Sequence, residues 1–187
     1  MIVLTCSGTG GHVYPAVAVA SHLENKPFTF IINKNRVAET IVRGHQYPYL
    51  GIDVSEKTNL LILFAFFKVL FFFIKHSITH VYSFGGKTTL PVVLAAWMCR
   101  IPITLFEQNV IPGKANRLLS VFANTICVSF EESKRYFSKS SKKIITTGNP
   151  VRCTYPKDPP LNDVLALPWK PEKRCLAFGG SQGAYAI

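Results

Sequence analysis

The stretch Thr5–Ala16, TCSGTGGHVYPA, decides the fold of this chain. It follows a hydrophobic run and precedes a run rich in alanine and valine. Glycines between a strand and a helix let backbone N–H groups surround an anion at the helix N-terminus, where the helix dipole favours negative charge. The dinucleotide-binding fingerprint is not met, because its third glycine would fall on Val13. The stretch therefore predicts a strand, a loop and a helix, with either an anion site or a tight turn at the loop.

The same alternation of strand and helix continues along the chain. Strands are expected at Ile2–Cys6, Phe28–Ile32, Tyr47–Ile52, His80–Ser83, Ile103–Phe106, Thr125–Val128 and Ile144–Thr146. Helices are expected at Val13–Glu24, Arg36–Arg43, Leu60–His76, Thr89–Cys99, Lys114–Phe122 and Glu131–Phe137. Short apolar strands that alternate with helices predict an α/β fold, a Rossmann-like parallel sheet with helices on both faces. Ligands of such folds bind at the carboxyl ends of the strands.

The alternation predicts three regions. Residues 1–152 form the expected N-terminal domain. Residues 153–173 contain five prolines and read as a linker. Residues 174–187 begin the pattern again, with a strand at Cys175–Phe178 and glycines after it. We expect these residues to be the first strand and glycine loop of a second α/β domain, most of which this chain lacks.

Composition favours an anionic partner. The formal net charge is +11, from 21 Lys and Arg against 10 Asp and Glu. Nucleic acid is not expected, because the sequence has no helix-turn-helix or zinc-finger pattern and no interleaving of basic and aromatic residues. The five cysteines include no closely spaced pair, so no metal site or redox pair is predicted. Cys6, Cys127 and Cys175 lie in apolar runs and are expected in the core, which suits a cytoplasmic protein.

A second glycine loop, SFGGKTTLP, starts at Ser83. Gly86, Lys87 and Thr88 resemble the end of a nucleotide-binding P-loop, but that motif needs a glycine where the chain has Val81. Two glycines and two threonines at a helix start still predict an oxyanion site, to which Lys87 would add positive charge. The alternative is a glycine turn with a threonine cap.

Two further polar segments follow predicted strands. Glu107, Gln108 and Asn109 supply a carboxylate and two amides that can hydrogen-bond sugar hydroxyls or an acetamido group. The alternative is a loop that caps the next helix. In the segment GNPVR, Arg152 can bind a phosphate or form a surface ion pair.

Taken in order, the segments GTGGHVYPA, GGKTTLP, FEQN, GNPVR and GGSQGA closely resemble the MurG family. These enzymes transfer N-acetylglucosamine from UDP-N-acetylglucosamine to lipid I, an undecaprenyl-linked acceptor, and so form lipid II in peptidoglycan synthesis. The resemblance covers Met1 to Ala184 and implies the N-terminal half of a GT-B glycosyltransferase with inverting chemistry. It implies no metal or other cofactor, and a peripheral location on the cytoplasmic face of the bacterial plasma membrane. The chain departs from the family at Lys87, Thr89 and Phe106, where the family usually has Tyr, Ser and His.

The resemblance also implies roles for individual residues. His12 is the candidate general base, since a histidine can be neutral near pH 7, and Glu107 is the rival base. The expected contacts of UDP-N-acetylglucosamine are Thr9, Gly10, Gly11, Asn109, Arg152, Ser181 and Gln182. The expected contacts of the acceptor diphosphate are Gly85, Gly86, Lys87, Thr88 and Thr89.

The segment NLLILFAFFKVLFFFIKH, Asn59–His76, is apolar except for its lysines and terminal residues. Its apolar part would span about 22 Å as a helix, less than the roughly 30 Å of bilayer hydrocarbon. Lys57, Lys68 and Lys75 would fall within about 20° of one another around that helix. Lysines beside Phe71 and Phe72 predict a helix that lies on an anionic membrane surface. The alternative is a core-facing helix with a solvated lysine edge.

Two other readings stay open. Another GT-B enzyme, such as a glycolipid glycosyltransferase or a nucleotide-sugar epimerase, would share the glycine loops but not the full order of motifs. A non-catalytic fragment is the second, because in the MurG family the uracil pocket lies in the remainder of the second domain. We therefore expect this chain by itself to be inactive in sugar transfer.

Overall fold

The computed structural model describes residues 1–8, 10–23, 25–34, 37–54, 59–137 and 143–151. These residues form a seven-stranded parallel sheet with the strand order β3-β2-β1-β4-β5-β6-β7. The strands are β1 Ile2–Cys6, β2 Phe28–Asn33, β3 Tyr49–Ile52, β4 His80–Ser83, β5 Ile103–Glu107, β6 Thr125–Val128 and β7 Lys143–Thr146. The α/β fold class and the parallel sheet are confirmed.

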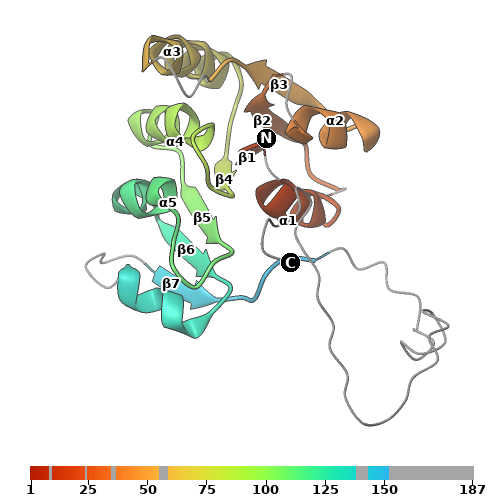
Figure 1. Ribbon diagram of the computed structural model, residues 1–187. Helices are drawn as coiled ribbons and strands as arrows, with labels where there is room; N and C mark the ends of the chain where they lie inside the picture. The colour runs from red at the N-terminus through yellow and green to blue at the C-terminus, as the bar shows by residue number, and fades with distance from the viewer. Residues whose placement is uncertain (9, 24, 35–36, 55–58, 138–142, 152–187) are drawn as a thin grey trace, which may run out of the picture.

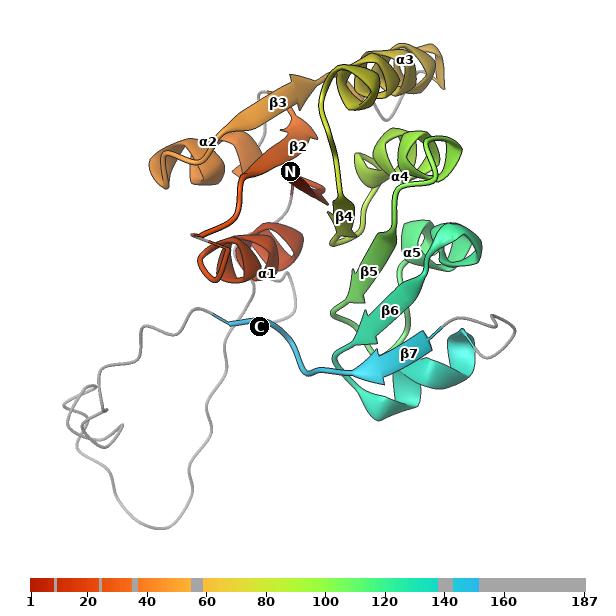
Figure 2. The same ribbon diagram turned by 180° about the vertical axis from the view of Figure 1, so that it is seen from behind.

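Helices cover both faces of the sheet (Figures 1 and 2). Two of them, α1 Gly10–Ala20 and α2 Val37–Gly44, lie on one face. On the other face lie α3 Asn59–Lys75, α4 Thr89–Met98 and α5 Lys114–Leu119, followed by the 3₁₀ helix η1 Ser120–Phe122. A second 3₁₀ helix, η2 Glu131–Tyr136, connects β6 to β7. Most of the expected elements differ by a few residues at one end or both; α1, for example, runs from Gly10 to Ala20 rather than from Val13 to Glu24. The expected helix Glu131–Phe137 is a 3₁₀ helix.

The alternation of side chains along each strand builds two apolar cores. Val3, Ile31 and Val81 point to the face covered by α3, α4 and α5. Leu4 and Phe30 point to the other face and pack with residues of α1 and α2. Because the inner strands are buried on both sides, they are continuous apolar runs, as expected for a parallel sheet. The predicted core cysteines Cys6 and Cys127 are both buried.

Strand order changes direction between β1 and β4, which lie side by side although about 75 residues separate them. The loops that follow these strands are held together, since Ser7 N donates to Gly85 O at 3.0 Å and Phe84 N donates to Thr5 O at 2.9 Å. Gly86 has a φ of +87°, and a Cβ on it would lie 2.0 Å from Ser7 Cβ. A glycine is therefore required here both for backbone conformation and for close approach.

Helix α3 is apolar on two sides. Ala65, Val69 and Phe73 are buried against the core. A second stripe of large apolar side chains is exposed on the same helix, and it consists of Leu60, Leu63, Phe64, Phe67, Phe71 and Ile74. We call this the α3 stripe; Phe71 and Ile74, for example, are 69% and 73% exposed. None of the helices in the described residues is long and apolar enough to span a membrane.

The structure adds two details on the predicted membrane contacts. Phe72 is only partly exposed, because it packs against the core and its ring lies 4.4 Å from that of His76. Lys68 is exposed as expected, but its ammonium donates to Gly51 O of β3 at 2.8 Å and so is bound to the sheet edge. Lys57 of the predicted lysine row lies outside the described residues, as do the predicted linker and the strand Cys175–Phe178.

Replacing Gly86 by alanine is expected to lower the free energy of unfolding by roughly 2–4 kcal/mol, because the new methyl group meets Ser7 and the positive φ becomes strained. Gly44→Ala is the matched control, since its Cβ would have no neighbour within 4 Å. Urea denaturation followed by circular dichroism measures both variants. Equal stability of the two would contradict the close approach of the β1–α1 and β4–α4 loops.

Candidate functional site

Three loops meet at the carboxyl ends of β1, β4 and β5. His12, in the first turn of α1, lies 3.2 Å from Gln108 of the β5–α5 loop, measured from ring Nδ1 to amide Oε1. Gly85 of the β4–α4 loop lies beside His12 and Asn116, because a Cβ built on it would be 3.4 Å from His12 Cε1 and 3.2 Å from Asn116 Nδ2. The fold thus brings His12 together with a polar residue that follows β5. We call this the three-loop site.

The carboxylate of Glu107 organises one side of the three-loop site. Its Oε1 accepts hydrogen bonds from the backbone N and side-chain Nδ2 of Asn109, at 2.9 and 3.0 Å. Its Oε2 accepts from Gly113 N and Asn116 Nδ2, both at 3.0 Å. The side chain is 2% exposed, and no lysine or arginine among the described residues pairs with it. A carboxylate whose four acceptor positions are occupied in this way shapes a loop, so the geometry argues against Glu107 as the base.

Asn109 is held at the surface by this carboxylate. Its amide N–H₂ is used by Glu107, and its backbone carbonyl accepts from the hydroxyl of Ser133 at 3.0 Å. The residue is exposed, and no hydrogen bond from the described part of the chain reaches its Oδ1. The side chain can therefore offer an acceptor oxygen to a ligand from a fixed position.

Asn116 was not predicted from the sequence. It is 2% exposed on α5, and its Nδ2 donates both to Phe106 O at 2.9 Å and to Glu107 Oε2 at 3.0 Å. Within the described residues its Oδ1 has no hydrogen-bond partner. The available signal was an asparagine in the first turn of a short helix, where a polar side chain commonly bonds to the preceding loop.

The β4–α4 loop only partly fits the predicted diphosphate site. Thr88 and Thr89 are buried beneath the loop, and the Thr89 hydroxyl donates to Gly86 O at 2.8 Å. Gly85 is buried and its carbonyl is used by Ser7. Of the five predicted residues, Gly86 is half-buried and Lys87 is exposed, so these two are the ones that a ligand can reach. The threonines are buried because the helix starts at Thr89 and its first turn packs onto the sheet.

Several predicted donor contacts cannot be placed. Thr9, Arg152, Ser181 and Gln182 lie outside the described residues. Gly10 is buried and Gly11 is exposed at the start of α1, where backbone N–H groups without helical partners are available to an anion.

A thiol adjoins the site but is not a candidate nucleophile. Cys6 is the last residue of β1 and is fully buried, and burial raises the pKa of its thiol to about 12. The thiolate is the reactive form of cysteine, so this side chain stays unreactive near neutral pH. Burial also lowers the pKa of His80, but that residue lies at the amino end of β4, away from the three-loop site.

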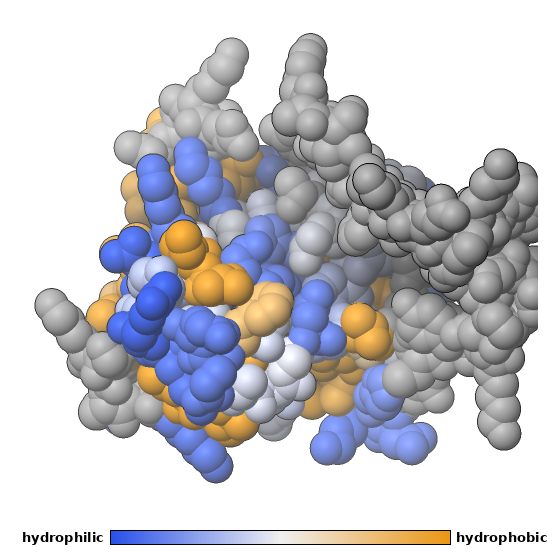
Figure 3. Space-filling model, turned by 60° about the horizontal axis from the view of Figure 1, so that its bottom comes forward, coloured by the Kyte–Doolittle hydropathy of each residue, from blue (hydrophilic) through white to orange (hydrophobic). Residues whose placement is uncertain are grey.

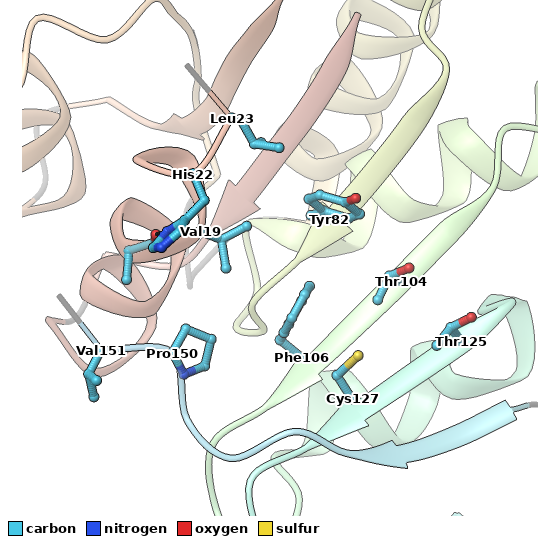
Figure 4. A pocket seen from close by; sticks show the side chains of 11 residues that line it. Val19, His22, Leu23, Tyr82, Thr104, Phe106, Thr125, Cys127, Pro150 and Val151 are labelled. Atoms are coloured by element: carbon cyan, nitrogen blue, oxygen red, sulfur yellow. Dashed lines mark hydrogen bonds between the residues drawn. The ribbon is translucent and has the colours of Figure 1, made fainter. Parts of the chain in front are cut away.

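A separate hollow of about 490 Å³ lies on the α1 face of the sheet (Figure 4). Val19 of α1 and His22, just after that helix, line one side, and Tyr82, Phe106 and Cys127 of the strands line the other. Its lining is mostly apolar, whereas the underside of the molecule is a mixture of hydrophilic and hydrophobic side chains (Figure 3). The hollow therefore suits apolar contact rather than an anion.

Replacing Glu107 by glutamine is expected to destabilise the chain by about 2–3 kcal/mol, because one oxygen that accepts two N–H groups becomes a donor that opposes them. Glu132→Gln, at an exposed position, is the matched control and should leave the urea midpoint almost unchanged. If both variants unfold at the same urea concentration, the carboxylate does not organise the loop.

Comparisons with known proteins agree with the fold and with the motifs. The glycosyltransferase family 28 N-terminal domain matches residues 2–128. A curated relative from Caldicellulosiruptor saccharolyticus is 38% identical, over 98% of this chain and 53% of the relative. It is named UDP-N-acetylglucosamine--N-acetylmuramyl-(pentapeptide) pyrophosphoryl-undecaprenol N-acetylglucosamine transferase. The chain spans about half the length of the curated relatives that it matches.

Solved structures give the same result. The crystal structure of MurG from Acinetobacter baumannii is 28% identical with a TM-score of 0.69, over 80% of this chain and 46% of that one. A UDP-GlcNAc 2-epimerase from Neisseria meningitidis is 21% identical with a TM-score of 0.65, over 80% of this chain and 47% of that one, a likeness of fold alone. The resemblance to MurG is thus confirmed, and the chain belongs to glycosyltransferase family 28, whose N-terminal domain it carries.

Proposed function

We propose that this chain is the acceptor-side half of an inverting glycosyltransferase that moves N-acetylglucosamine from UDP-N-acetylglucosamine to lipid I and so forms lipid II. The observation that carries the proposal is the contact between His12 and Gln108, which joins two of the family-like motifs at the carboxyl end of the sheet. The 38% identity to a relative named for this reaction supports the choice of substrates.

His12 is the proposed general base. No described residue bonds to its Nε2, so this nitrogen is available to take the proton from the C4 hydroxyl of the acceptor sugar. The oxygen of that hydroxyl attacks the anomeric carbon of the donor sugar, the bond from that carbon to the diphosphate breaks, and UDP leaves. Attack from the side opposite to UDP inverts the anomeric configuration. The hydrogen bonds that occupy the Glu107 carboxylate favour His12 over Glu107 in this role.

The donor and the acceptor are expected to use different parts of the site. We assign the donor sugar to Asn109 Oδ1, and a further donor contact to the start of α1 at Gly10 and Gly11. Gly86 and Lys87 are the remaining candidates for the acceptor diphosphate. Thr9, Arg152, Ser181 and Gln182 stay donor contacts by family resemblance alone.

The α3 stripe is the proposed membrane contact. Exposed apolar side chains also occur on α4, α5 and η1, on the same side of the sheet, at Trp97, Met98, Leu118 and Val121. Residues 59–122 contain six lysines and arginines but one acidic residue, the buried Glu107. An apolar surface with positive charge and almost no negative charge suits a peripheral contact with anionic lipid. In a bacterial cell the acceptor lipid would place this contact on the cytoplasmic face of the plasma membrane.

Activity can be tested in a chimera that joins this chain to the remaining length of the Caldicellulosiruptor saccharolyticus relative. With lipid I and labelled UDP-N-acetylglucosamine, His12→Ala should lower kcat by about 10²–10⁴, the usual contribution of a general base. His22→Ala is the control: this histidine lines the apolar hollow rather than the three-loop site, so its replacement should leave kcat unchanged. Near-normal turnover by His12→Ala, or an equal loss in both variants, would remove His12 from this role.

Membrane contact can be tested on the chain itself by flotation with vesicles that contain anionic lipid. Phe67→Ser and Phe71→Ser should each weaken binding about tenfold, since each removes on the order of 1.4 kcal/mol of apolar burial. Val37→Ser, at an exposed position on α2, is the control and should bind as the parent chain does. Added salt should weaken binding further. Equal binding by all three variants would show that the α3 stripe does not touch lipid.

A further inference from the structure

The amide of Gln108 has two neighbours, and together they fix its orientation. Its Nε2 donates to the carbonyl oxygen of Phe106 at 3.4 Å, and its Oε1 lies 3.2 Å from His12 Nδ1. A carbonyl oxygen only accepts hydrogen bonds, so the N–H₂ group must face Phe106. The amide oxygen is left to face the histidine, and the reverse orientation would set two oxygens against each other.

The same reasoning then fixes the proton on the histidine. The amide oxygen also only accepts, so His12 Nδ1 must carry a hydrogen to donate to it. In a neutral imidazole one nitrogen carries the hydrogen and the other has a free lone pair. The lone pair is therefore on Nε2, to which no described residue bonds.

The support behind Gln108 does not depend on His12. The Phe106 carbonyl that receives the amide also accepts from Asn116 Nδ2 at 2.9 Å, and Asn116 is itself bonded to the buried Glu107 carboxylate. Glu107 also holds the backbone of Asn109, the residue that follows Gln108. Both sides of Gln108 are thus held by buried groups, which limits where its side chain can reach.

We propose that Gln108 is a positioning residue that holds neutral His12 in the tautomer with hydrogen on Nδ1, so that Nε2 is unprotonated. Its use in proton removal rests on the proposed function, but the tautomer itself does not. One hydrogen bond of this kind shifts the ratio of the two tautomers by roughly threefold to tenfold.

The test is nuclear magnetic resonance of the 187-residue chain with ¹⁵N-labelled histidine, at a pH above the histidine titration range. Long-range ¹H–¹⁵N correlations identify which ring nitrogen carries the hydrogen, and loss of one signal in His12→Gln assigns His12. His22 is the internal reference, because its Nδ1 lies 2.9 Å from the backbone carbonyl of Ala18 and must also carry a hydrogen. Its signal should stay the same in every variant, which also reports that the chain is folded.

In the parent chain His12 should have hydrogen on Nδ1. Gln108→Leu removes the acceptor and should shift the population toward hydrogen on Nε2, whereas Gln108→Glu keeps an acceptor oxygen and should keep the parent tautomer. If Gln108→Leu does not fold, the parent chain and Gln108→Glu still decide the matter. Hydrogen on Nε2 in the parent chain, or a tautomer that is unchanged in a folded Gln108→Leu chain, would overturn the proposal.

These outcomes are separate from those of the proposed function. A shifted tautomer in Gln108→Leu supports the positioning role even if the chimera transfers no sugar. In an active chimera, Gln108→Leu should lower kcat by the factor by which the population with hydrogen on Nδ1 falls, and should leave KM for the donor unchanged. An unchanged tautomer together with normal transfer would contradict the positioning role and leave the proposed function standing.

Discussion

The arrangement of the three-loop site depends on one buried carboxylate. Glu107 ends β5, and its two oxygens accept four N–H groups from the loop and helix that follow. An unpaired charge is costly to bury unless hydrogen bonds replace its water, and here the loop itself supplies them. The carboxylate and the loop conformation are therefore mutually dependent. Asn109, Gln108 and, through Gln108, the ring of His12 all take their positions from it.

The sheet places that carboxylate near the other two loops. Strands β1 to β3 extend the sheet in one direction and β4 to β7 extend it in the other, so β4 pairs with β1 rather than with β3. The β1–α1 and β4–α4 loops are then in contact, and they approach this closely because Gly86 has no side chain. Folds with this order bind ligands at the reversal point for this reason. The fold sets where a ligand binds, while the side chains of His12, Gln108 and Asn109 set which chemistry it meets there.

Periodicity in the sequence could not assign the faces of α3. The side chains of α3 are apolar almost all the way around the helix, so their pattern does not indicate which face is buried. The row of lysines was the one feature that distinguished its faces. Packing against α4 and the sheet determines which face of α3 is buried. Ala65, Val69 and Phe73 fill the space between the helix and the core, and the α3 stripe remains exposed to solvent. The same contact explains why Phe72 is half-buried and why Lys68 binds the edge of β3.

By itself the sequence determined the elements, their class and the loops that matter. Apolar runs of strand length alternate with helices, glycines follow β1 and β4, and the segment EQN begins at the last residue of β5, so local patterns were sufficient. Only the tertiary structure decided which side chains are buried and which of them form hydrogen bonds with one another. It buried Glu107, Thr88 and Thr89, which look as available in the sequence as His12, and it recruited Asn116, which has no motif around it. The reason is physical: hydrogen bonds between side chains join residues up to 96 positions apart here, and no local pattern records which donors will meet which acceptors.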